Sequence, residues 1–177
     1  MLHSDQLVDA RLRRLAKEIE TLAGKDESAL QYSREVASLR RRAATELFSV
    51  CAAFVDGVNR LLSRPEVRLD PPEFSDDNFQ EDGVNLLQIN VRGRILQLEF
   101  EATPELVSTE DFRIPYTLSG AARAFNQALL DKDLIEEQLI FYTLEKEKTM
   151  WRYFDARTYR SGELDQEYLV GLMEQLL

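Results

Sequence analysis

The hydrophobic pattern of this chain changes from a helical to an alternating period across residues 65–83, and that change limits the possible folds more than any other feature. Before residue 64, apolar residues recur every three or four positions, which is the spacing of one face of a helix. In residues 84–102, they alternate with polar residues, as in strands that bury one face. Because the helical and alternating runs are segregated along the chain, we expect an α+β protein.

The first helical run predicts a helix that packs on a partner helix. Its apolar residues are spaced 4, 3, 4 and 3 positions apart and form a heptad seam: Val8, Leu12, Leu15, Ile19 and Leu22. Gly24 fits the position just after a helix, and Ser28 with Gln31 fits a capping box that starts the next one. We therefore expect an N-terminal helical pair.

The second helix should end near Ser63, because the residue before Pro65 disfavours the α region. Its apolar stripe keeps helical spacing throughout: Val36, Leu39, Ala43, Leu47, Val50, Phe54, Val58 and Leu61. At about 1.5 Å per residue, such a helix would be about 50 Å long. A domain of this size does not cover that length, so we expect part of the helix to project or to pair.

Three regions follow from these patterns. Residues 1–64 form the helical region, and residues 65–83 are rich in proline and acid without a period, which predicts a linker. Residues 84–177 are expected to form an α+β domain that shares one structural unit with the second helix.

A hairpin is predicted at the start of that domain, where Arg92-Gly93 joins two alternating runs. A two-residue turn there would pair Val91 with Arg94, and it would place the apolar residues of both strands on one face. The same turn pairs Ile89 with Leu96 and Leu87 with Leu98.

The remaining elements complete the predicted fold. A strand is expected at 111–118, with Pro115 in an edge position, followed by a short helix from Ser119 to about Asp133. Two strands follow at 138–145 and 149–156, around a Glu147-Lys148 turn. The final helix has Asp165 as its N-cap and a core stripe of Leu169, Leu172 and Leu176. The sequence thus predicts a mainly antiparallel five-stranded sheet packed by helices, preceded by the helical pair.

The last two predicted strands carry the candidate binding residues. Both of their faces are apolar, and a strand that is apolar on both sides requires cover on both. One interpretation is a second core layer covered by the N-terminal helices. The other is an interface, because Tyr and Trp are enriched at binding hot spots. The residues concerned are Ile140, Tyr142, Leu144, Trp151 and Tyr153.

The residue inventory excludes several kinds of catalysis. His3 is the only histidine and Cys51 the only cysteine, so a Ser-His-Asp or Cys-His arrangement and a histidine-rich metal site are excluded. Cys51 lies in an apolar helical stretch, where we expect a buried, inert thiol. No glycine pattern typical of a phosphate-binding loop occurs, and we expect neither a metal nor a cofactor.

Charge gives two further candidates and one exclusion. The acidic run 75–83 fails the calcium-loop template and is interpreted as a solvated loop. Arg40, Arg41 and Arg42 are interpreted as a solvated helix face that pairs with Glu35 and Glu46; the alternative is a phosphate or membrane contact. Residues 65–177 hold 11 basic against 23 acidic residues, which disfavours binding of nucleic acid.

The compartment is predicted from cysteine use and hydropathy. One cysteine allows no intramolecular disulfide, which favours a reducing compartment. The longest apolar stretch, 47–55, is about half of a membrane span. We therefore expect a cytoplasmic protein that does not span a membrane.

From about Thr45, the expected order of elements, helix, three strands, helix, two strands, helix, resembles that of the small acidic class I chaperones of type III secretion systems. The segments that carry the resemblance are DGVNLLQINVRGRILQLEF for the first hairpin, FNQALLDKDL for the middle helix and GELDQEYLVGLMEQLL for the closing helix. The N-terminal extension and the charged Lys146-Glu147-Lys148 turn depart from that pattern. The resemblance implies a cytoplasmic homodimer that binds an extended client segment along its sheet and has no enzymatic activity.

We expect a non-catalytic protein-binding module that forms homo-oligomers or binds a protein partner. Two alternatives remain open from the sequence. A carboxylate-dependent enzyme would need a pocket of converging Asp and Glu residues with raised pKa values. A nucleic-acid or membrane-surface contact would use Arg40–Arg42.

Overall fold

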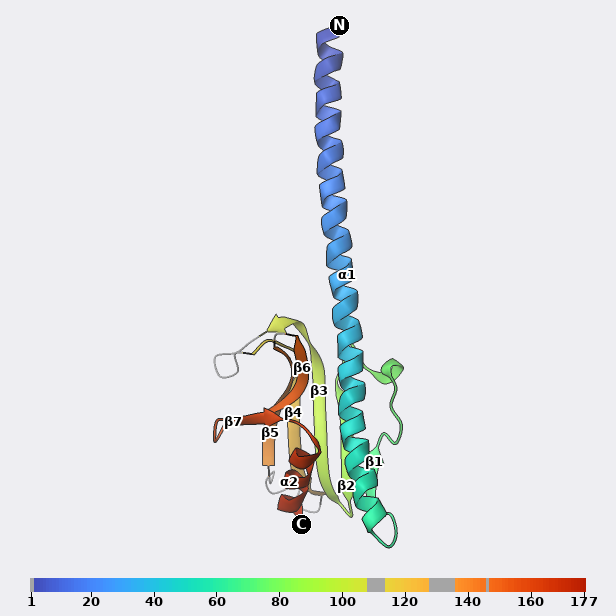
Figure 1. Ribbon diagram of the computed structural model, residues 1–177, viewed down its shortest axis with the longest axis vertical. Coiled ribbons are helices and arrows are strands. Elements are labelled where there is room, and N and C mark those ends of the chain that lie inside the picture. Colours follow the sequence, from blue (N-terminus) through green and yellow to red (C-terminus); the bar gives the residue numbers. More distant parts are fainter. Residues whose placement is uncertain (1, 108–113, 128–135, 146) are drawn as a thin grey trace. The chain divides into compact units, whose positions relative to one another are not determined.

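The computed structural model describes residues 2–107, 114–127, 136–145 and 147–177, without the side chains of residues 2, 3 and 105–107. One long helix, α1 (Leu2–Leu61), precedes a seven-stranded antiparallel sheet, and α2 (Gln166–Leu176) closes the chain (Figure 1). The strands follow chain order across the sheet: β1 (Val67–Asp70), β2 (Asn85–Val91), β3 (Arg94–Val107), β4 (Tyr116–Asn126), β5 (Glu136–Glu145), β6 (Lys148–Asp155) and β7 (Arg160–Glu163). The expected helical pair and five-stranded sheet are wrong, although the class is α+β.

Helix α1 runs without a break through the segment where two helices were predicted. Gly24 costs about 1 kcal/mol in a helix interior, which a long helix tolerates. The predicted capping residues make bonds inside the helix instead: the Ser28 hydroxyl donates to the Gly24 carbonyl at 3.0 Å, and the Gln31 amide donates to Glu35 at 3.0 Å. Polar side chains that bond four residues away do not mark a helix start.

The predicted linker contains a strand. β1 pairs with β2, with Val67 opposite Val91 and Leu69 opposite Ile89. The side chain of Asn59 near the end of α1 fixes this strand, because its Oδ1 accepts from the Val67 amide at 3.0 Å and its Nδ2 donates to the Val67 carbonyl at 2.9 Å. The sequence pattern did not predict β1, because the hydrogen bonds that fix this strand are made with β2 and with Asn59 of α1. The segment also contains a short 3₁₀ helix, η1 (Asp76–Asn78).

The predicted helix from Ser119 is wrong over residues 119–126, which belong to β4, and residues 128–133 lie outside the described part of the chain. Likewise, the predicted strand at 111–118 begins outside it, and its last residues are the start of β4, a central strand. Small residues on both faces of β4 hide the alternation. At Gly120, a Cβ atom would lie 1.8 Å from the Glu99 carbonyl oxygen, so only glycine fits where β3 approaches this closely.

The predicted hairpin is confirmed in its register. Val91 pairs with Arg94, Ile89 with Leu96 and Leu87 with Leu98. Arg92 and Gly93 have φ angles of 52° and 89°, so both turn residues are left-handed, as in a type I′ turn.

The β5–β6 pair has the predicted faces but another register. Glu145 pairs with Lys148, whereas a Glu147-Lys148 turn would have paired it with Met150. This shift is by an even number of residues, so every side chain stays on its predicted face. Strand β7, which pairs Gly162 with Tyr153, was not predicted.

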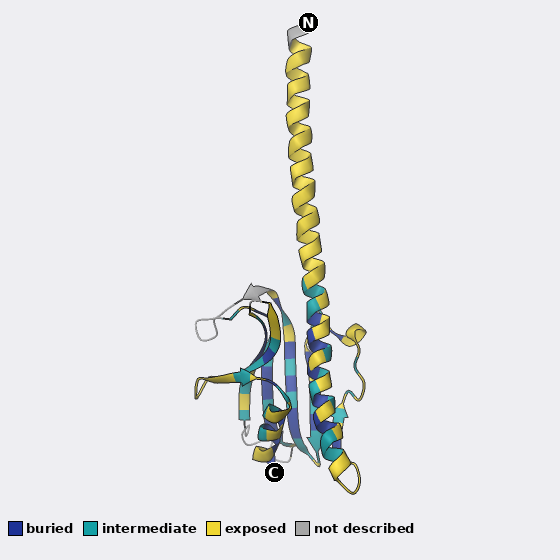
Figure 2. Cartoon of the chain, viewed as in Figure 1, coloured by how far each residue is buried: buried dark blue, intermediate teal, exposed yellow. Residues whose placement is uncertain are grey.

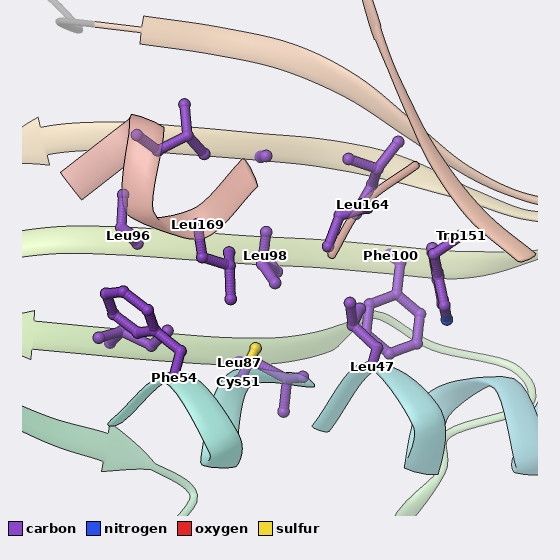
Figure 3. Packing of buried hydrophobic residues seen from close by; sticks show 14 of the residues in the cluster. Leu47, Cys51, Phe54, Leu87, Leu96, Leu98, Phe100, Trp151, Leu164 and Leu169 are labelled. Carbon is purple, nitrogen blue, oxygen red and sulfur yellow. The ribbon is translucent and has the colours of Figure 1, made fainter. Parts of the chain in front are cut away.

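One core lies between the sheet and the two helices that cover the same face (Figure 3). Leu47, Cys51 and Phe54 of α1 face Leu87 of β2 and Leu98 of β3. The predicted C-terminal helix is confirmed, because the Asp165 side chain accepts from the Tyr168 amide at 2.9 Å and the stripe Leu169, Leu172 and Leu176 is buried.

The chain divides into two compact units, residues 1–38 and residues 39–177. The division falls inside α1, so the first unit is helix alone and the second contains the rest of α1, the sheet and α2.

Candidate protein-binding surface

The aromatic residues of β5 and β6 lie mostly in the core of the second unit. Ile140, Tyr142 and Trp151 are buried, while Leu144 and Tyr153 are half-buried. The Trp151 indole donates to the Ala43 carbonyl of α1 at 2.7 Å, a bond that seats the strand against the helix backbone. This arrangement corresponds to the second core layer, which was one of the two interpretations of the sequence; the other was an interface.

Tyr142 and Tyr153 have partners from the helices as well. The Tyr142 hydroxyl donates toward Glu46 at 3.1 Å and lies 2.9 Å from the Thr149 hydroxyl, and burial raises its pKa. The Tyr153 ring stacks on Tyr168 of α2 with centroids 4.3 Å apart. Since α1 and α2 already satisfy these side chains, little of this set is free to contact another protein.

The heptad seam in the first unit is exposed, by contrast. All described side chains from residue 4 to residue 35 are exposed, and α1 acquires buried residues only further along (Figure 2). The exposed seam consists of five residues that are each 51–59% exposed: Val8, Leu12, Leu15, Ile19 and Leu22. Three large apolar residues that the heptad pattern missed are also exposed nearby: Leu7, Leu30 and Tyr32.

The residues beside the exposed seam are small or charged. With Leu12 and Ile19 at heptad position a, the g positions hold Arg11, Glu18 and Lys25 and the e positions hold Asp9, Ala16 and Ala23. Flanking charges at these positions set partner choice and orientation in coiled coils, and alanine permits close approach. The surface therefore has both the apolar row and the selective charges of a helix-pairing site.

The arginine cluster is divided by burial. Arg41 and Arg42 are exposed, but Arg40 is buried, so the expectation of one solvated face is wrong for Arg40. Its guanidinium donates to Thr117 at 2.9 Å, to Glu81 at 2.7 Å and to the Thr103 carbonyl. Arg40 thus joins the start of the second unit's helix to the sheet and to the acidic loop.

The acidic loop is attached to α1 by polar contacts. Besides the Arg40–Glu81 ion pair, the Thr45 hydroxyl donates to Asp76 at 2.6 Å. Within the described ranges, no group of three or more His, Cys, Asp or Glu side chains is placed to hold a metal ion. Two of the loop's acids, Glu81 and Asp76, therefore contact the helix.

The lone thiol has no catalytic environment. Cys51 is fully buried in the α1–sheet core, and burial raises its pKa to about 12. The nucleophilic form of cysteine is the thiolate, so this side chain is neutral at ordinary pH.

A polar hollow of about 590 Å³ lies between β5–β7 and α2, and several carboxylates line it. Two of its acids, Glu136 and Asp155, both accept from Arg157. Burial by itself would raise the pKa of Asp155, but the Arg157 amide and guanidinium hold that pKa below its usual value. A general acid needs a raised pKa, so Asp155 does not support the carboxylate-enzyme alternative.

A second hollow of about 430 Å³ lies against β3–β6 and is lined by aromatic and acidic residues that include Tyr116, Phe141, Phe154, Glu99 and Glu101. Phe141 and Tyr116 are in contact there, with ring centroids 4.5 Å apart. This surface lies opposite the main core, and the sequence pattern indicated it only as the second apolar face of β5 and β6.

In the part of the chain that the structure describes, every helix is too short or too polar to cross a bilayer. No family model, no curated protein and no solved structure matches this chain.

Proposed function

We propose that this chain is a non-catalytic protein-binding module that self-associates through the exposed seam of α1. The observation that carries the proposal is the row of five large apolar side chains, each more than half exposed, on one face of a continuous helix. Monomeric soluble proteins rarely leave such a contiguous apolar surface in water.

The energetics favour pairing of modest strength. Removing an apolar side chain from water contributes about 1.5–3 kcal/mol when it was fully exposed, and about half of that for the seam residues. Association costs at least about 4 kcal/mol of translational and rotational freedom. Five residues from each of two copies exceed the lower end of that cost, and we expect a dissociation constant on the order of micromolar.

Sedimentation of the full chain between about 1 and 100 µM tests the proposal. We expect an average mass that rises with concentration above the 20.5 kDa of one chain. Leu15→Glu places a charge in the seam while keeping a good helix former, and it should weaken association at least about tenfold.

Ala10→Glu is the matched control, because Ala10 is exposed and lies at heptad position f, on the opposite side of the helix from the seam. It should leave the association unchanged. A mass of 20.5 kDa at every concentration would refute the proposal.

Two finer statements accompany this function as proposals. We place the module in the cytoplasm, and the support is the single, buried cysteine, which requires no oxidising compartment. The resemblance to secretion chaperones and the client segment that it implies stay predictions.

A further inference from the structure

We infer that the exposed seam is occupied by the same segment of a second copy, antiparallel to the first, with Leu12 opposite Leu15 and Arg11 opposite Glu18 of the second copy. This inference rests on the proposed function and specifies its partner and geometry. It follows from comparing the charges that each possible arrangement would bring together.

A parallel, in-register pair gains no charge interactions from this sequence. In that arrangement each g residue flanks the following e residue of the other helix, so Arg11 would face Ala16 and Glu18 would face Ala23. The next a position after the seam is Asp26, which would face its own copy. Two like carboxylates would then meet at the interface.

An antiparallel pair brings a positions opposite d positions, and g positions opposite g positions. With Leu12 opposite Leu15 of the second copy, Val8 falls opposite Ile19, so two-fold symmetry gives four fully apolar layers. At each end of the overlap, Leu22 falls opposite Asp5. The g positions then form two Arg11–Glu18 ion pairs across the interface. Asp26 falls at the end of the overlap and meets no like charge.

Neighbouring antiparallel registers are worse. A shift of one heptad sets Leu15 opposite Ile19, and it would place Glu18 against its own copy and Arg11 against Lys25. A shift of two heptads pairs Glu18 with Lys25 but sets the Asp26 carboxylate against Leu15. The first register places its only carboxylate contacts within the a and d layers, Asp5 with Leu22, at the ends of the overlap, whereas the two-heptad shift places Asp26 between apolar layers.

The antiparallel geometry sets the distance between the Gln31 side chains of the two copies. The two-fold axis passes between residues 13 and 14, so Gln31 lies about 17 residues beyond it in each copy. At about 1.5 Å per residue, the two Gln31 side chains are roughly 50 Å apart. In a parallel pair they would lie within roughly 20 Å, about two helix diameters.

Charge exchange tests the arrangement with the full chain. Arg11→Glu alone creates Glu–Glu contacts and Glu18→Arg alone creates Arg–Arg contacts, so each should weaken self-association about tenfold at low salt. An equimolar mixture of the two variants restores opposite charges in both contacts, and it should associate as tightly as the unchanged chain. Lys17→Glu, an exposed change at heptad position f, is the matched control and should have no effect.

A distance measurement separates this inference from the function on which it rests. Spin labels on Gln31→Cys report the separation directly, because the natural thiol, Cys51, is buried. A dimer with a separation near 50 Å and restored association in the mixture supports the antiparallel pair. A dimer with labels within 20 Å and no response to charge exchange overturns it while the proposed function stands. A monomer at every concentration overturns both.

Discussion

The two halves of α1 carry the same kind of periodic apolar pattern but differ in burial. Leu15 in the first half is 52% exposed, whereas Leu47 in the second half is completely buried against the sheet. Figure 2 shows the change from exposed to buried residues along one unbroken helix. Helical spacing therefore specifies an apolar face, but it does not specify what covers that face.

The widths of the two apolar faces differ, and the difference indicates their partners. The exposed seam is a strict a/d row with charged residues between, which is the narrow face that one partner helix covers. In the second half, adjacent residues are buried together, as Ala43 with Ala44 and Phe54 with Val55 show. A broad face of this kind suits a sheet and a second helix.

The largest expected contrast between the halves is in folding stability. Leu47→Ala leaves a cavity in the core and should lower the free energy of unfolding by about 3 kcal/mol. Leu15→Ala should change it by less than about 0.5 kcal/mol in a dilute sample, because the side chain is exposed. Urea denaturation measures both values, and equal losses would show that the exposed seam packs within its own chain.

A smaller contrast is expected within the arginine cluster. Arg40→Met keeps much of the side-chain packing but removes three hydrogen bonds, and it should cost about 2 kcal/mol of unfolding free energy. Arg41→Met changes an exposed neighbour and should stay within about 0.5 kcal/mol. If both variants unfold at the same urea concentration, the buried contacts of Arg40 contribute nothing measurable.

Thiol labelling distinguishes the halves with almost no change in stability. In a Gln31→Cys variant, the introduced thiol is exposed, while Cys51 is buried with a pKa of about 12. Because the thiolate is the reactive form, we expect one thiol per native chain to react at pH 8 and the second only in denaturant. Rapid reaction of both in the native protein would contradict the packing of the second half.

Sequence pattern was sufficient where a segment's conformation depends on its own residues. The β2–β3 register followed from strict alternation around Arg92-Gly93, and the N-cap of α2 followed from Asp165 ahead of a leucine stripe. The sequence pattern failed to predict segments whose conformation depends on contacts with other elements. β1 depends on its pairing with β2 and on Asn59, and β4 carries small residues that fit a helix equally well.

The candidate binding surface was predictable only in part. The exposed seam was visible as a heptad row, but the predicted break at Gly24 concealed that this row continues into the buried half of one helix. The aromatic residues of β5 and β6 indicated a need for cover without indicating its source. That cover comes from α1 and α2, through contacts such as Trp151 with Ala43, which lie 108 positions apart in sequence, and Tyr153 with Tyr168.

The buried contacts of Arg40 divide α1 into two levels of local stability. Residues after this point open only when the sheet contacts are lost, whereas the exposed turns before it are held by their own backbone bonds and by any partner that covers them. Under the proposed self-association, we expect amide protection in the first half to rise with protein concentration and that in the second half to follow folding. One helix would then report on assembly and on folding independently.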